Sequence, residues 1–189
     1  MLEINIKAKH LKNNRCFFIA KKNILKKGDF KMAHIMNMCR VVNPRPVTFV
    51  NSVAGLERGL FLEIVGMAKN NVWGGNADDF EAYKVQLATA DTKAENLVIN
   101  TTVPKQYDER LEEKDFVMAD GAIGRAHYIT TGDEYTLAKD FVTGVTAVGD
   151  EVELAADGKL AKKDSGTAIG EVVRIYKWNG QESIMIRFY

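Results

Sequence analysis

The chain has 189 residues, of which 46% are hydrophobic and 27% are charged, a composition typical of globular proteins. No apolar run approaches the ~20 residues that a membrane-spanning helix needs, so we expect no membrane partner. Cys16 and Cys39 form neither a metal-binding spacing nor a disulfide framework, and the three histidines are scattered along the chain. We therefore expect no metal, no cofactor and no catalytic residue, and we interpret His127 as structural.

The net charge of +1 conceals two segments of opposite charge. Residues 1–31 contain nine Lys or Arg and two acids, whereas residues 32–189 contain 17 bases and 23 acids. We interpret residues 1–31 as a basic leader or arm and residues 32–189 as a single domain with a net charge of −6. An acidic domain of this kind is not expected to bind nucleic acid.

The basic segment, residues 1–31, has two interpretations that stay open. As a protein arm, it would bind phosphates or an acidic partner surface. Alternatively it is upstream sequence that is not translated, because residues 27–31 can be back-translated to a purine-rich AAAGGAGA just before a start codon at Met32. A signal or transit peptide is a weaker interpretation, because the apolar run at residues 16–20 is short for the core of such a signal.

The next segment is held extended by two prolines. Each proline fixes φ and biases its predecessor away from helix. One interpretation is a rigid lead-in to the first strand, and the other is an arm that lies on a neighbouring molecule. The residues of this candidate arm are Val41, Val42, Asn43, Pro44, Arg45, Pro46 and Val47.

The middle of the chain is dominated by short strand patterns separated by turns. Only residues 102–116 have helical character, with Leu111 as the single clear apolar anchor, and Trp73 lies in a loop where we expect it to cap a sheet core. Strands are predicted at residues 47–53, 60–67, 83–87, 97–99, 116–118, 123–129 and 135–137.

Residues 141–189 form the clearest unit of the chain. A strand at residues 151–154 is followed by Asp157-Gly158, and a longer strand at residues 169–178 is followed by Asn179-Gly180. Both pairs are strong signals for tight hairpin turns. The last strand is predicted at residues 183–189. The number of short strands predicts an all-β fold, a small antiparallel barrel or sandwich with an extended N-terminal arm.

Part of this unit carries a resemblance to a known class of proteins. The stretches 147–160 (AVGDEVELAADGKL) and 166–173 (GTAIGEVV) resemble small β proteins of tailed-phage virions. They are similar in particular to head decoration (capsid cement) proteins and to β domains of other capsid-associated proteins. The resemblance covers about 30 residues and its motifs are those of general β-turns.

The resemblance implies a structural virion protein and not an enzyme. Such a protein is made in the bacterial cytoplasm, sits on the capsid exterior and stabilises contacts between major capsid subunits. Its partners would be the major capsid protein and further copies of itself, often as a trimer. An extended arm would add contacts to a neighbour by strand addition.

Three alternatives remain. The first is a nucleic-acid-binding β-barrel with residues 1–31 as its basic arm, for which Arg174, Lys177, Trp178 and Arg187 would have to gather on one sheet face. The second is a phage tail or baseplate β protein. The third is a biotinyl- or lipoyl-like carrier modified on Lys159, although that residue lacks the usual flanking Met or acids.

Overall fold

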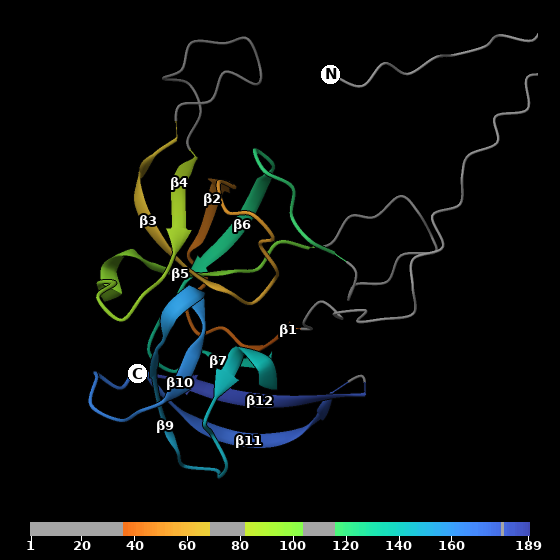
Figure 1. Ribbon diagram of the computed structural model, residues 1–189, viewed down its shortest axis with the longest axis vertical. Coiled ribbons are helices and arrows are strands. Elements are labelled where there is room, and N and C mark those ends of the chain that lie inside the picture. The colour runs from red at the N-terminus through yellow and green to blue at the C-terminus, as the bar shows by residue number, and fades with distance from the viewer. Residues whose placement is uncertain (1–35, 69–81, 104–115, 179) are drawn as a thin grey trace, which may run out of the picture. The chain divides into compact units, whose positions relative to one another are not determined.

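The computed structural model describes residues 36–68, 82–103, 116–178 and 180–189, all of which lie in the compact unit Met32–Tyr189. The described residues are all-β and contain a closed five-stranded barrel and a seven-stranded sheet (Figure 1). The predictions for Trp73 and for a helix around Leu111 fall outside the described residues.

The barrel is built from consecutive strands of the middle of the chain. Their order around the barrel is β2-β4-β3-β5-β6. All pairs are antiparallel except β2 with β4, which is parallel, so the barrel is not purely antiparallel as predicted. The barrel strands are β2 (Pro46–Val50), β3 (Phe61–Met67), β4 (Tyr83–Leu87), β5 (Leu97–Asn100) and β6 (Ile123–Tyr128).

The seven-stranded sheet has the order β1-β7-β12-β11-β9-β10-β8. It contains the whole C-terminal unit predicted from the sequence, but β1 and β7 extend it from earlier parts of the chain. β7 pairs with β12, and β1 pairs with β7 at the edge of the sheet. Its strands are β1 (Met36–Arg40), β7 (Glu134–Ala138), β8 (Val142–Thr143), β9 (Glu151–Leu154), β10 (Leu160–Lys162), β11 (Gly170–Trp178) and β12 (Gln181–Phe188).

Short 3₁₀ turns join some of these strands. They are η1 (Ala94–Asn96), η3 (Lys139–Phe141) and η4 (Ala156–Gly158).

Two predicted strands differ from the structure for local reasons. The strand predicted at residues 47–53 ends at Val50, because the Asn51 side chain accepts the Val53 N–H and donates to three carbonyl groups. An asparagine that binds neighbouring backbone in this way competes with a strand ladder. The strand predicted at residues 116–118 is reduced to one bridge between Met118 and Leu56.

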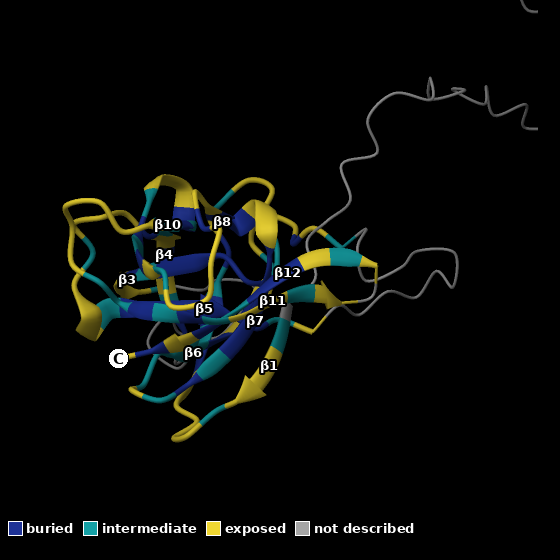
Figure 2. Ribbon diagram, turned by 90° about the horizontal axis from the view of Figure 1, so that it is seen from below, coloured by how far each residue is buried: buried dark blue, intermediate teal, exposed yellow. Residues whose placement is uncertain are grey.

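A single hydrophobic core extends through both the barrel and the sheet. Phe61 of the barrel and Phe188 of the sheet have ring centroids 5.8 Å apart, and Tyr135 packs edge-on against Phe188 at 5.9 Å. Figure 2 shows buried residues concentrated along the strands of the core and exposed residues in many of the turns, while β1 is also largely exposed. The β9–β10 hairpin adds a backbone contact, since Gly158 N–H donates to Ala88 O of the barrel at 3.0 Å.

Candidate interaction surfaces

The predicted arm, residues 41–47, is a linker between the sheet and the barrel. It follows β1, and its last two residues, Pro46 and Val47, begin β2. Val42, Asn43, Pro44, Arg45 and Pro46 are all exposed, whereas Val47 is buried in the core. The segment is exposed over residues 42–46 and bends at residues 42 and 43, and both of its ends are part of the folded protein.

The linker is fixed at its start by the buried carboxylate of Asp133. Val42 N–H donates to Asp133 Oδ1 at 2.7 Å, and Thr130 N–H donates to Asp133 Oδ2 at 2.8 Å. Thr130 and Asp133 lie in the connection from β6 to β7, so one side chain joins both chain crossings between barrel and sheet. Asp133 itself is fully buried, and its hydrogen bonds compensate the loss of hydration.

The linker has little backbone left for strand addition. Pro44 and Pro46 have no N–H, and the Val42 N–H is used by Asp133. The carbonyl of Arg45 accepts the Tyr128 N–H at 3.1 Å, and the guanidinium of Arg45 lies 4.8 Å from the centre of the Tyr128 ring. A partner would therefore contact this segment mainly through its side chains and the remaining carbonyls.

A second surface lies on the outer face of the sheet, opposite the core. Residues directly paired across strands share a face, and Arg174, Tyr176 and Trp178 pair with Met185, Ser183 and Gln181. The core residues Ile184 and Ile186 lie on the other face of β12. Arg174, Tyr176 and Trp178 therefore form one strip along β11, here named the β11 strip.

The β11 strip is held in place by side-chain contacts. The guanidinium of Arg174 lies 4.7 Å from the centre of the Tyr176 ring, and Tyr176 meets Trp178 edge-on at 6.3 Å. The Tyr176 hydroxyl shares a 2.7 Å hydrogen bond with Thr136 Oγ1, which also lies 3.0 Å from Cys39 Sγ. This network reaches from β11 across the sheet to β1.

The four residues named for a nucleic-acid surface do not form one cationic patch. Lys177 points to the opposite face of β11, paired with Glu182. Arg187 forms ion pairs with Glu134 at 2.8 Å and with Glu171 at 3.7 Å. Arg174 and Trp178 lie on either side of Tyr176 along β11, and Arg187 shares their face of the sheet but is paired with the two glutamates.

A cavity of about 670 Å³ opens beside the barrel strands β2 and β6. Its lining is mostly apolar and includes the exposed side chains of Val103, Val117 and Ile123. Residues 103 and 116, on either side of a segment outside the described residues, both contribute to this wall.

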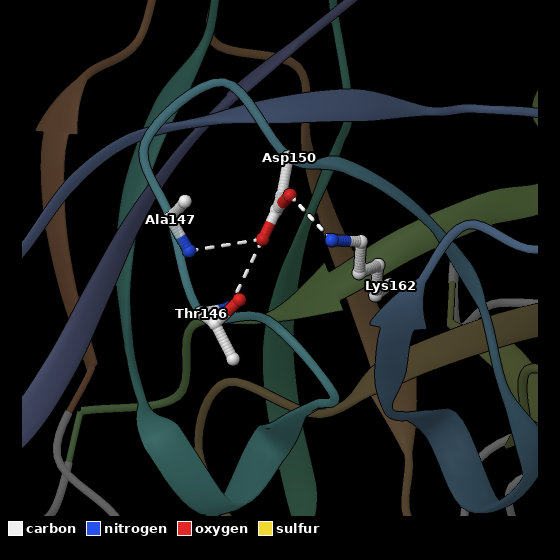
Figure 3. A network of polar contacts seen from close by, with 4 residues as sticks. All are labelled: Thr146, Ala147, Asp150 and Lys162. Atoms are coloured by element: carbon white, nitrogen blue, oxygen red, sulfur yellow. Dashed lines mark hydrogen bonds and ion pairs between the residues drawn. The ribbon is translucent and has the colours of Figure 1, made fainter.

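The loop before β9 is organised by Asp150 (Figure 3). Its carboxylate accepts the N–H groups of Thr146 at 3.0 Å and Ala147 at 2.9 Å, and it binds Lys162 Nζ at 2.7 Å. The Lys162 ammonium and the two backbone donors lower the pKa of Asp150 to about 2. Each donor stabilises the charged form, so Asp150 acts as a structural turn residue.

His127 lies at the end of β6, half-buried, with its Nδ1 atom buried and without a hydrogen-bond partner. Burial lowers the pKa of His127, and the nearby carboxylate of Asp133 acts in the opposite direction. The Tyr135 hydroxyl is also buried without a hydrogen-bond partner. Its pKa is raised, mainly by burial and to a smaller extent by the negative charge of Asp133. Both side chains are packed near Asp133, and we interpret these pKa shifts as effects of packing and not as signs of a catalytic site.

The tip of the β9–β10 hairpin is not an exposed carrier site. Gly158 is buried against the barrel, and Lys159 lies half-buried with its ammonium 5.9 Å from the Phe141 ring centre. A carrier lysine must reach a partner enzyme from an open turn, so this geometry disfavours the carrier interpretation.

In the part of the chain that the structure describes, no group of three or more His, Cys, Asp or Glu side chains is arranged to hold a metal ion. None of the helices there is long and apolar enough to span a bilayer. A comparison of the sequence with protein-family models and with curated proteins found no match.

Proposed function

We propose that this chain is a non-enzymatic structural protein that binds the outer surface of a tailed-phage capsid and stabilises contacts between major capsid subunits. The observation that carries the proposal is the exposed linker of residues 42–46. It is exposed, stiffened by two prolines and tied to the fold at both ends. A preorganised segment loses little conformational entropy on binding.

The stretches that resemble decoration proteins support the proposal through their position in the fold. Residues 147–160 form the Asp150 turn, β9 and the hairpin to β10, and residues 166–173 lead into β11. They therefore form the framework of the sheet and not its exposed face. The net charge of −6 on residues 32–189 suits a surface that faces away from the packaged DNA.

The test is co-sedimentation of the full chain with expanded phage heads that lack their decoration protein. We expect saturable, stoichiometric binding and greater resistance of the heads to heat. Val42→Asp should weaken binding because it places a charge on the linker, whereas Val148→Asp should not. Val42 and Val148 are both exposed, at 50% and 64%, and Val148 lies in a separate loop.

The outcomes distinguish the proposal from its alternatives. Absence of binding to heads would refute the capsid proposal, and binding to purified tails or baseplates instead would favour a tail protein. Equal binding by the two valine variants would leave capsid binding intact but remove the linker from the contact surface.

A further inference from the structure

We propose that the β11 strip is a homodimer interface in which Arg174 of each copy packs on Trp178 of the other. The strip lies on the outer face of the sheet and comprises Arg174, Tyr176 and Trp178. The inference goes beyond capsid binding, because it assigns a partner, a second copy of this chain, to a different surface.

The composition and exposure of the strip are those of an interface and not of a core. Arginine, tyrosine and tryptophan are the residues most enriched at the energetic centres of protein interfaces. Arg174 is exposed, Tyr176 is half-buried and Trp178 is 37% exposed. In Figure 2 the turn end of the β11–β12 hairpin is coloured mainly as exposed and intermediate.

The strip is also preorganised. Tyr176 is held by its hydrogen bond to Thr136, a side chain that is 1% exposed. The Arg174 guanidinium lies over the Tyr176 ring, and the Tyr176 and Trp178 rings meet in a T-shaped arrangement. Side chains that are ordered before association lose less entropy when they bind.

The spacing of the strip makes it complementary to itself. The three residues alternate along one strand, so Arg174 and Trp178 lie at equal distances on either side of Tyr176. A twofold axis that crosses the strand at Tyr176 brings the two strips face to face in antiparallel directions. Each Arg174 then faces the Trp178 of the other copy, and the two Tyr176 rings meet at the axis. Closed twofold contacts are the commonest form of homo-oligomer.

The charge of Arg174 favours the antiparallel arrangement of the two strips over a parallel one. A twofold axis along the strand would place the two Arg174 side chains against each other, which costs energy. The antiparallel arrangement separates them and gives each one an indole face, the best ring for a cation–π contact. Arg174 is available for this contact because its guanidinium forms no ion pair among the described residues and lies only against Tyr176 there.

The observations favour a second copy over single-stranded nucleic acid as the occupant. A nucleic-acid platform combines stacking rings with a groove of cations along the backbone. Of the neighbouring cations, Arg187 is paired with two glutamates and Lys177 lies on the other face. The strip therefore offers one cation that forms no ion pair among the described residues, on a domain whose net charge is −6.

The experiment is sedimentation equilibrium of the full chain over a concentration series from about 1 to 500 μM, since a small interface implies weak association. We expect a monomer–dimer equilibrium. Arg174→Glu and Trp178→Ala should each weaken it by at least about tenfold, because a single substitution removes both symmetric contacts. Lys177→Glu, on the opposite face of the same strand, is the matched control and should leave the equilibrium unchanged.

The exchange variant Arg174→Trp/Trp178→Arg provides a test that a general effect on folding would not pass. It keeps the composition of the strip and restores the facing cation–π pairs in the reverse order, so dimerisation should recover to within a few-fold of the original. Thermal melting of each variant by circular dichroism checks that the sheet is intact.

Four results would overturn the proposal. They are a chain that stays monomeric over the whole series, a trimer, a dimer that tolerates both single substitutions, and an exchange variant as weak as the single variants. The strip would instead be assigned to nucleic acid if a monomeric chain bound a fluorescent oligo-dT and both Arg174→Glu and Trp178→Ala abolished this binding. Failure of the dimer proposal would not refute capsid binding by the linker, and the reverse also holds.

Discussion

Gly158 at the tip of the β9–β10 hairpin gives the most direct test of how the sheet is attached to the barrel. Its φ is +66°, and a Cβ atom added there would lie 2.4 Å from the carbonyl oxygen of Phe61 and 3.1 Å from Leu87 Cδ2. Gly158→Ala therefore combines two costs. The left-handed backbone costs about 1–2 kcal/mol for a residue with a Cβ, and overpacking against the barrel adds about 1–3 kcal/mol.

The matched control separates these two costs. Gly121 has a nearly identical φ of +71°, and a Cβ added there meets nothing within 4 Å. Gly121→Ala should cost only the backbone term, about 1–2 kcal/mol. The difference between the two variants, about 1–3 kcal/mol, measures the close approach of the hairpin tip to the barrel.

The assay is urea unfolding of both variants at neutral pH, followed by circular dichroism. For a chain of this size each kcal/mol lowers the melting temperature by about 2–4 °C, so thermal melts should rank the variants in the same order. Equal destabilisation by Gly121→Ala and Gly158→Ala would refute the docking of the hairpin tip. If neither Gly158→Ala nor Gly121→Ala lowers the free energy of unfolding, the cost assigned to the left-handed backbone conformation would be refuted as well.

Two further predictions concern carboxylates. The folded pKa of Asp150 is about 2, below its ordinary 3.8, so its stabilising effect is present above pH 4 and is lost as pH falls toward 2. Asp150→Asn should lower the midpoint of urea unfolding at pH 7, with a difference that shrinks between pH 4 and pH 2; a constant difference would contradict this assignment. Asp133→Asn should cost about 1–3 kcal/mol, because the amide cannot accept both the Val42 and Thr130 N–H groups. In this variant the Val42 and Thr130 amides should exchange their hydrogens faster. Unchanged exchange at both amides would show that Asp133 does not hold them.

The local parts of the fold could be predicted from the sequence. Alternation placed the strand at residues 83–87, which is β4, and the Asp157-Gly158 pair placed the β9–β10 hairpin. Trp178 pairs with Gln181 across the turn predicted at residues 179–180. These features depend on neighbouring residues only, and their signals lie within a few positions of the chain.

The non-local pairings could not be predicted in the same way. Nothing in the period of residues 36–40 indicates that they pair with β7, nearly 100 positions away, or that β2 and β4 run parallel. The prolines identify the linker of residues 41–47, but its attachment depends on the buried carboxylate of Asp133. The sequence Gly132-Asp133 reads as an ordinary turn and does not distinguish this aspartate from a solvated one. The β11 strip was missed as a unit because the bulge between Val172 and Arg174 changes the face on which later residues lie.

The two proposals are independent in their evidence but reinforce each other physically. A monomer would present one linker, residues 42–46. A single contact through five exposed residues with few free backbone donors is expected to be weak. In the proposed dimer each particle carries two such linkers, and binding of the first raises the effective concentration of the second at a neighbouring capsid site. The gain requires that the spacing of the two linkers match the lattice. Arg174→Glu should therefore weaken binding to heads more than it weakens binding to isolated capsid subunits, because only a lattice offers two sites at once.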